Sequence, residues 1–151
     1  MMIKPKLSLK ARALRFLSMR EYSRAELLRK LSPYVQEGEN LESILDWLES
    51  GQYLSDQRFS ESLTHRRQGR FGNQKIFAEL HSHQLKNVDI SELKRALQQN
   101  EGQRATEVLH RKFSSCALDA SEKAKQMRFL AQRGFSSSAI HQAMRAEREE
   151  I

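Results

Sequence analysis

Apolar residues recur every three or four positions along most of the chain, and this spacing predicts helices. The first example is Leu9, Ala13, Phe16 and Leu17, whose spacing places them on one face of a helix. A residue that can accept hydrogen bonds from the first free amides stands before such runs, as Ser8 does here. Nine segments of this kind follow one another without an alternating strand pattern, so we predict an all-α fold.

Local motifs predict where several helices begin and end. Residues 23–26, 89–92 and 119–122 each place a capping side chain three positions before a glutamate, which is the pattern of a capping box. Gly51 follows an apolar run, where a left-handed glycine closes a helix without a Cβ clash. We also expect a new helix to begin just after Gly102.

The predicted helices repeat along the chain. A shift of 49 residues places Leu27 on Ile76 and Asn40 on Asp89, so core falls on core and cap on cap. A shift of 46 or 47 relates the second third of the chain to the last. We predict one continuous repeat domain of three three-helix repeats, at residues 7–52, 53–100 and 101–148. Because each repeat alone buries little core, we expect the repeats to stack into an elongated, curved molecule.

Charge is distributed unevenly along the 151 residues, whose formal net charge is +7. Residues 1–35 carry a net +7, residues 36–64 a net −6 and residues 65–86 a net +4. Two basic blocks therefore flank an acidic one. This pattern is typical either of a solvated surface or of a surface that faces a polyanion beside a patch of opposite sign.

The composition excludes several classes of protein. Cys116 is the only cysteine, so an intrachain disulfide is excluded, and we expect a reducing, cytoplasmic location. No apolar run is long enough for a secretory signal or a membrane span. The basic N-terminal segment is compatible with a helix on a membrane surface, but a nucleic acid or an acidic partner is the favoured interpretation. We expect no membrane partner.

Catalytic and metal-binding patterns are not found. The segment GRFGNQK at residues 69–75 lacks the spacing of a phosphate-binding loop. His81 and His83 point about 200° apart on a helix, so they cannot share a metal ion. Cys116 has no identifiable base to activate it. We predict a binding protein that has no enzymatic activity, cofactor or metal.

Several elements, found in order along nearly the whole chain, resemble the RecX family. Residues 48–59, LESGQYLSDQRF, resemble its element that ends in D-x-R-F, and residues 66–80 show its Arg, Gly and K-I-x-x-E-L pattern. Residues 13–31 are similar to the opening of the family, and residues 129–135, FLAQRGF, to its F-L-x-x-R-G-F element. The chain departs from the family pattern at Ser60, where Ala is usual, and in LHSHQL at residues 80–85, where Gly is usual.

The resemblance implies a non-enzymatic regulator of the bacterial recombinase RecA. Members of the family bind the RecA–DNA filament along its helical groove and reduce its ATPase, strand-exchange and co-protease activities. This implies a monomeric protein that modulates DNA repair and the SOS response, with the RecA filament as its partner and weaker binding to single- and double-stranded DNA. Two alternatives remain: a direct DNA-binding module of helix-turn-helix type, and a scaffold for an unrelated acidic protein.

Basic residues are the candidates for binding, because they pair with phosphates and with acidic protein surfaces. The first set, beside the central motif, comprises Arg66, Arg67, Arg70 and Lys75. The first repeat adds Arg12, Arg15, Arg20 and Arg24. The third repeat adds Arg111, Lys112, Lys125, Arg128 and Arg133. For each, the alternative is a solvated charge or a bond within the protein. Contact aromatics would be Phe71, Trp47 and Tyr53, although we expect these three rings to pack inside the protein.

Overall fold

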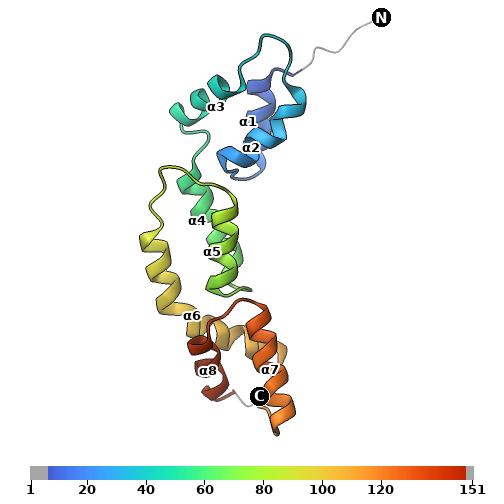
Figure 1. Ribbon diagram of the computed structural model, residues 1–151, viewed down its shortest axis with the longest axis vertical. Coiled ribbons are helices and arrows are strands. Elements are labelled where there is room, and N and C mark those ends of the chain that lie inside the picture. Colours follow the sequence, from blue (N-terminus) through green and yellow to red (C-terminus); the bar gives the residue numbers. More distant parts are fainter. Residues whose placement is uncertain (1–6, 149–151) are drawn as a thin grey trace, which may run out of the picture. The chain divides into compact units, whose positions relative to one another are not determined.

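The computed structural model describes residues 7–148, which form eight α-helices, one short 3-10 helix and no strand (Figure 1). The all-α prediction is therefore confirmed. Residues 1–6, which carry part of the basic N-terminal segment, lie outside the described residues. Among the described helices, none combines the length and the apolar character needed to cross a membrane.

The first of two compact units consists of the chain up to Ser62 together with His83–Val88. Its elements are α1 (Leu9–Met19), α2 (Arg24–Leu31), η1 (Ser32–Tyr34), α3 (Leu41–Ser50) and the start of α4 (Asp56–Arg67). Helices α1, α2 and α3 pack around one apolar core (Figure 1), in which Leu27, Leu31, Leu45 and Leu48 are completely buried. We call this part of the chain unit 1.

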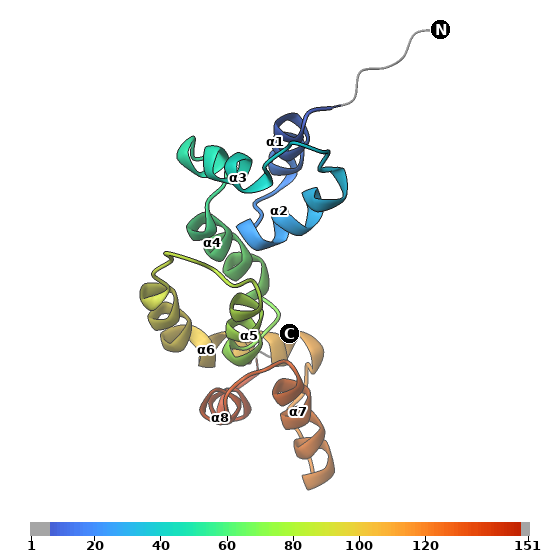
Figure 2. The ribbon, with the colours of Figure 1, turned by 45° about the horizontal axis from the view of Figure 1, so that its top comes forward.

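The second compact unit, unit 2, consists of Leu63–Ser82 and the chain from Asp89 onward. Its elements are the end of α4, then α5 (Asn73–Ser82), α6 (Ser91–Lys112), α7 (Ala120–Gln132) and α8 (Ser137–Arg145). Helices α7 and α8 pack against α6 (Figure 2). The apolar core between these three helices includes Leu109, Leu130 and Ala143, all fully buried.

Most helices begin where the sequence predicts. The side chains of Ser8, Ser23, Asn40, Asp119 and Ser136 each accept a hydrogen bond from the backbone amide three residues later. The predicted box at residues 89–92 is wrong. There the Asp89 carboxylate accepts hydrogen bonds from the amide and hydroxyl of Ser91, and the helix begins at Ser91 without a side-chain cap.

Gly51 lies just beyond α3, as predicted, but without the predicted left-handed conformation, and the helix start predicted after Gly102 is wrong. Gly51 has φ −83°, and the positive φ of 61° lies at Gln52 instead. A Cβ on Gly51 would approach the ring of Tyr53 to 2.7 Å. Gly102 lies inside α6, a single helix of 22 residues, where a Cβ would collide with the side chain of Gln142 on α8.

A buried carboxylate on α6 joins two neighbouring helices within unit 2. Glu101 accepts a hydrogen bond of 2.8 Å from the Asn73 amide at the start of α5 and one of 2.6 Å from the hydroxyl of Ser136, which caps α8. Arg104, one turn further along α6, bonds the Asn73 side chain and the carbonyl oxygen of Leu97. Burial lowers the pKa of Arg104, and the Glu101 charge opposes that shift.

We expect Glu101→Gln to lower the free energy of unfolding by about 2–4 kcal/mol, because it leaves the Arg104 charge uncompensated and turns one acceptor into a donor. Urea unfolding followed by circular dichroism measures this change. Glu107→Gln, on the exposed side of the same helix, is the matched control and should change stability by less than about 0.5 kcal/mol. Equal changes in the two variants would show that the Glu101 bonds do not stabilise unit 2.

Candidate functional site

The turn between α4 and α5, residues 68–72, brings several basic side chains of unit 2 together. The carbonyl oxygens of its first four residues have no helical partner, and arginines from α6 and from the end of α7 bond them. The bonds run from Arg104 to Gln68 (3.2 Å) and Phe71 (2.9 Å), from Arg111 to Gly69 (2.6 Å) and from Arg133 to Arg70 (3.4 Å).

The close approach of Gly72 to Gly134 fixes this turn beside the end of α7. The Gly72 amide donates to the Arg133 carbonyl oxygen (2.8 Å), and the Gln74 amide donates to that of Gly134 (3.1 Å). A Cβ on Gly72 would collide with the backbone of residues 134 and 135. Glycine is therefore required for α5 to begin at this point.

Several cations remain at the surface around the turn. Arg66, Arg70, Lys75 and Arg111 are exposed, and Arg133 is half-buried. Lys75 and Arg133 lie 5.9 and 5.7 Å from the centre of the Phe71 ring. Within residues 7–148, none of the five basic residues is in an ion pair. We call these five residues, Arg66, Arg70, Lys75, Arg111 and Arg133, the turn cluster.

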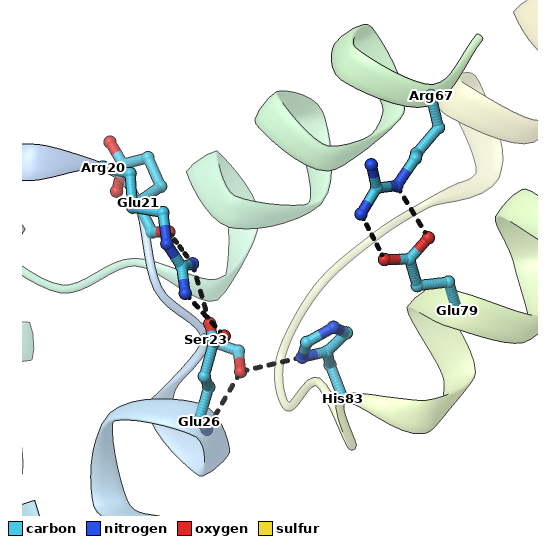
Figure 3. A network of polar contacts seen from close by, with 7 residues as sticks. All are labelled: Arg20, Glu21, Ser23, Glu26, Arg67, Glu79 and His83. Carbon is cyan, nitrogen blue, oxygen red and sulfur yellow. Dashed lines mark hydrogen bonds and ion pairs between the residues drawn. The ribbon is translucent and has the colours of Figure 1, made fainter. Parts of the chain in front are cut away.

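Arg67 differs from its neighbours because its charge is paired. Its guanidinium makes two hydrogen bonds, of 2.9 and 3.0 Å, to the carboxylate of Glu79 (Figure 3). These bonds raise the pKa of Arg67 above its usual range. Because Glu79 lies on α5, the pair joins α4 to α5 and belongs to the internal framework of the molecule.

Arg20 is paired in a similar way in unit 1. It makes two hydrogen bonds to Glu26, of 3.0 and 2.8 Å (Figure 3), and lies 3.6 Å from the centre of the Tyr22 ring. The hydrogen bonds that Arg20 donates to Glu26 raise the pKa of Arg20. Partial burial raises the pKa of Glu26, but the hydrogen bonds and charge of Arg20 outweigh it, so this pKa lies below its usual range.

Arg24 is held by three carboxylates on α3. Its nitrogens lie 2.8 Å from Glu42, 2.8 Å from Asp46 and 2.9 Å from Glu49. Burial lowers the pKa of Arg24, but the three carboxylates outweigh this effect and raise it. One arginine opposes three acids, so this side of α3 keeps an excess of negative charge.

The remaining candidates occupy varied environments. Arg12 stacks on Tyr34 at 3.8 Å, and Lys125 lies 6.0 Å from the ring of Phe113. The others are exposed, namely Arg15, Lys112 and Arg128. The expectation that Trp47 and Tyr53 pack inside the protein is wrong: these rings stack on each other at 5.5 Å and are 40% and 49% exposed.

The D-x-R-F element is part of the framework of unit 1. The Asp56 carboxylate accepts hydrogen bonds from the Arg24 amide at the start of α2 (2.8 Å) and from the Lys86 amide (3.2 Å). Arg58 bonds the Glu21 carboxylate and the Gln52 carbonyl oxygen. Phe59 is buried and contacts the His83 ring edge-on at 4.6 Å. His83 in turn hydrogen-bonds Ser23, the cap of α2 (Figure 3).

Glu101 and Arg104 have the corresponding part in unit 2, and neither is among the residues predicted from the sequence. A signal for Arg104 was present, because the shift of 46 residues predicted between the second and third repeats places Arg58 on Arg104. The same shift places Asp56 on Gly102, so it does not predict Glu101. The departure at residues 80–85 is also explained: Gln84 has a φ of 52° and takes the left-handed conformation in which the family usually has glycine.

Comparison with known proteins identifies a family. The model of the third three-helix domain of RecX matches residues 100–144. The regulatory protein RecX of Herminiimonas arsenicoxydans is 56% identical over 148 residues, which cover 98% of each chain. That of Herbaspirillum seropedicae is 55% identical over 142 residues, covering 94% of this chain and 92% of that protein. The crystal structure of RecX from Lactobacillus salivarius has the same fold, with a TM-score of 0.67 at 20% identity over 90% of this chain and 92% of that one.

The Arg20–Glu26 pair gives a prediction of pH dependence. Because the folded protein lowers the pKa of Glu26, the ionised carboxylate stabilises the fold at higher pH, and this contribution is lost as the pH falls through the lowered pKa. The free energy of unfolding should therefore fall more between about pH 7 and about pH 3 in the original protein than in Glu26→Gln. Glu61→Gln, at an exposed glutamate of α4, should show the same fall in the free energy of unfolding between these two pH values as the original protein. If Glu26→Gln does the same, the pair does not stabilise the fold.

Proposed function

This chain belongs to the RecX family, and we propose that it regulates RecA by binding the RecA–DNA filament and inhibiting its ATPase, strand-exchange and co-protease activities. It does so as a cytoplasmic monomer, by binding rather than by catalysis, and without a cofactor. The observation that carries the proposal is the family membership, at 55–56% identity over more than nine-tenths of the chain.

The turn cluster supports this function and is the proposed centre of the contact. Its cations have no carboxylate partner within the described residues, so their charge is available to phosphates or to acidic surfaces of RecA. Three arginines bond the carbonyl oxygens of the turn, which fixes the exposed side chains of Arg66, Arg70 and Lys75 on a rigid support. A rigid cationic surface loses little conformational entropy when it binds a polyanion.

Further contacts are proposed for the remaining candidate residues, those that make no ion pair within residues 7–148, which are Arg12, Arg15, Lys112, Lys125 and Arg128. Arg20, Arg24 and Arg67 are left out of the contact set, because binding through them would first break a pair within the protein. A filament repeats its surface along its axis. Several weak contacts on one chain therefore engage neighbouring protomers, and each raises the effective concentration of the next.

The double variant Arg66→Glu/Arg70→Glu tests the turn cluster. Half-inhibition of RecA ATPase on single-stranded DNA should need a concentration of this variant at least about tenfold higher than that of the original protein, because two attractive charges become repulsive. The helix signal in circular dichroism should not change. Inhibition at the original concentration would remove the turn cluster from the contact.

A matched double variant, Lys94→Glu/Arg95→Glu, is the control. It makes the same change in net charge at two exposed residues of α6 outside the turn cluster, so inhibition should stay close to that of the original protein. An equal loss would point to diffuse charge rather than a defined contact. Tight binding to bare duplex DNA, with a steep loss of affinity as salt is added, would instead favour a direct DNA-binding module.

A further inference from the structure

A second cationic feature of unit 2 is a cavity of about 460 Å³ between α7, α8 and the loop that precedes α7. Lys123 and Met127 are one turn apart on α7, and His141 and Arg145 are one turn apart on α8, so each pair shares a face of its helix. The volume lies in the range of roughly 300–1,000 Å³ that is typical of small-ligand sites.

The rim of this cavity is positively charged. Among residues 7–148, Lys123, Arg145, Arg148 and His141 line it, and no carboxylate of this part of the chain does. Arg148 is fixed by hydrogen bonds to the Phe113 carbonyl oxygen (3.0 Å) and to the side-chain oxygen of Gln126 (2.7 Å). Both acceptors are neutral, so the guanidinium is oriented while its charge is kept. Arginine and lysine gathered in this way favour a phosphate group.

The floor of the cavity is apolar and rich in sulfur. Met127 and Met144 are partly buried and pack against the core of unit 2, with one side toward the cavity. Thioethers make favourable contacts with flat aromatic rings and adapt to their shape. A phosphate-binding rim above such a floor matches a nucleotide, whose phosphate and base use both parts. The carboxylates of an acidic peptide would use the rim alone.

We propose that this cavity binds one nucleotide of single-stranded DNA, with the phosphate at Lys123, Arg145 and Arg148 and the base over Met127 and Met144. In a duplex the bases are stacked and paired, and therefore cannot enter, whereas a single strand turns a base outward at little cost. The family resemblance implies weak binding to single-stranded DNA without saying where, and the inference assigns that contact to a defined site. It rests on the proposed function only in that RecA filaments supply single-stranded DNA.

Cys116 provides a local reporter for the test. It is exposed, it lines the cavity, and it is the only cysteine of the chain. The rate at which iodoacetamide, a neutral reagent, alkylates Cys116 is measured with and without a short oligothymidylate, at a concentration shown by fluorescence anisotropy to saturate the protein. We expect the single strand to slow alkylation severalfold. A duplex of the same length and inorganic phosphate at equal ionic strength should leave the rate unchanged.

Two variants of the rim and one control complete the design. Lys123→Glu and Arg145→Glu should each require about tenfold more oligothymidylate for the same protection, because one charge-assisted contact becomes a repulsion. The control is Arg29→Glu, since Arg29 is also an exposed arginine in the last turn of a short helix. It should behave like the original protein. For each variant, the alkylation rate measured with oligothymidylate is divided by the rate measured without it.

The proposal is overturned if the single strand does not bind or does not protect Cys116. It is also overturned if duplex, inorganic phosphate or poly-glutamate protects equally, because the cavity would then be a general anion site or a site for an acidic peptide. Inhibition of RecA ATPase is measured on the same rim variants. If the single strand fails to protect Cys116 but the protein still inhibits RecA, the inference is wrong and the proposed function stands. If the single strand protects Cys116 but the protein does not inhibit RecA, the proposed function is wrong and the inference stands.

Discussion

The fold depends on carboxylates that bind the beginning of a helix other than their own. Apart from α6, the described α-helices have only 8 to 13 residues, too few to persist without tertiary support. Asp56 accepts a hydrogen bond from the first amide of α2, and Glu101 accepts one from the first amide of α5. Each carboxylate satisfies an amide that has no partner within its helix and complements the positive end of the helix dipole. Each also bonds a second segment, Lys86 or Ser136, and so fixes how the short helices of its unit meet.

The arginines fall into two groups according to the acceptors of their hydrogen bonds, and the two groups differ in what they can contribute to binding. Arg20, Arg24 and Arg67 bond carboxylates, so they are oriented and neutralised at once. Arg111 and Arg133 bond carbonyl oxygens, which orient a guanidinium but leave its full charge. Hydrogen bonds to neutral acceptors are therefore compatible with a surface that attracts a polyanion, whereas internal ion pairs are not. The net charge of +7 says little about binding until these two groups are distinguished.

Sequence patterns succeeded where the contact is local and failed where a distant residue decides it. A cap such as Asn40 needs only an amide three residues away, and the caps predicted at Ser8, Ser23, Asn40 and Asp119 are confirmed. The left-handed conformation expected at Gly51 lies at Gln52 instead, and no helix begins after Gly102, because α6 runs through this glycine where it approaches Gln142 on α8. A glycine inside a helix costs stability, and the missing Cβ at Gly102 leaves room for the Gln142 side chain of α8.

The sequence by itself determined the helical class, most helix starts, the resemblance to the RecX family and the surplus of basic residues around positions 66–75. Only the tertiary structure decided which basic residues, there and elsewhere in the chain, are neutralised by an ion pair and which are not. Arg67 meets Glu79 twelve residues away, and Arg24 meets Glu49 twenty-five residues away. No local pattern encodes such pairs, because their geometry is set by how helices pack rather than by the spacing of neighbours along the chain.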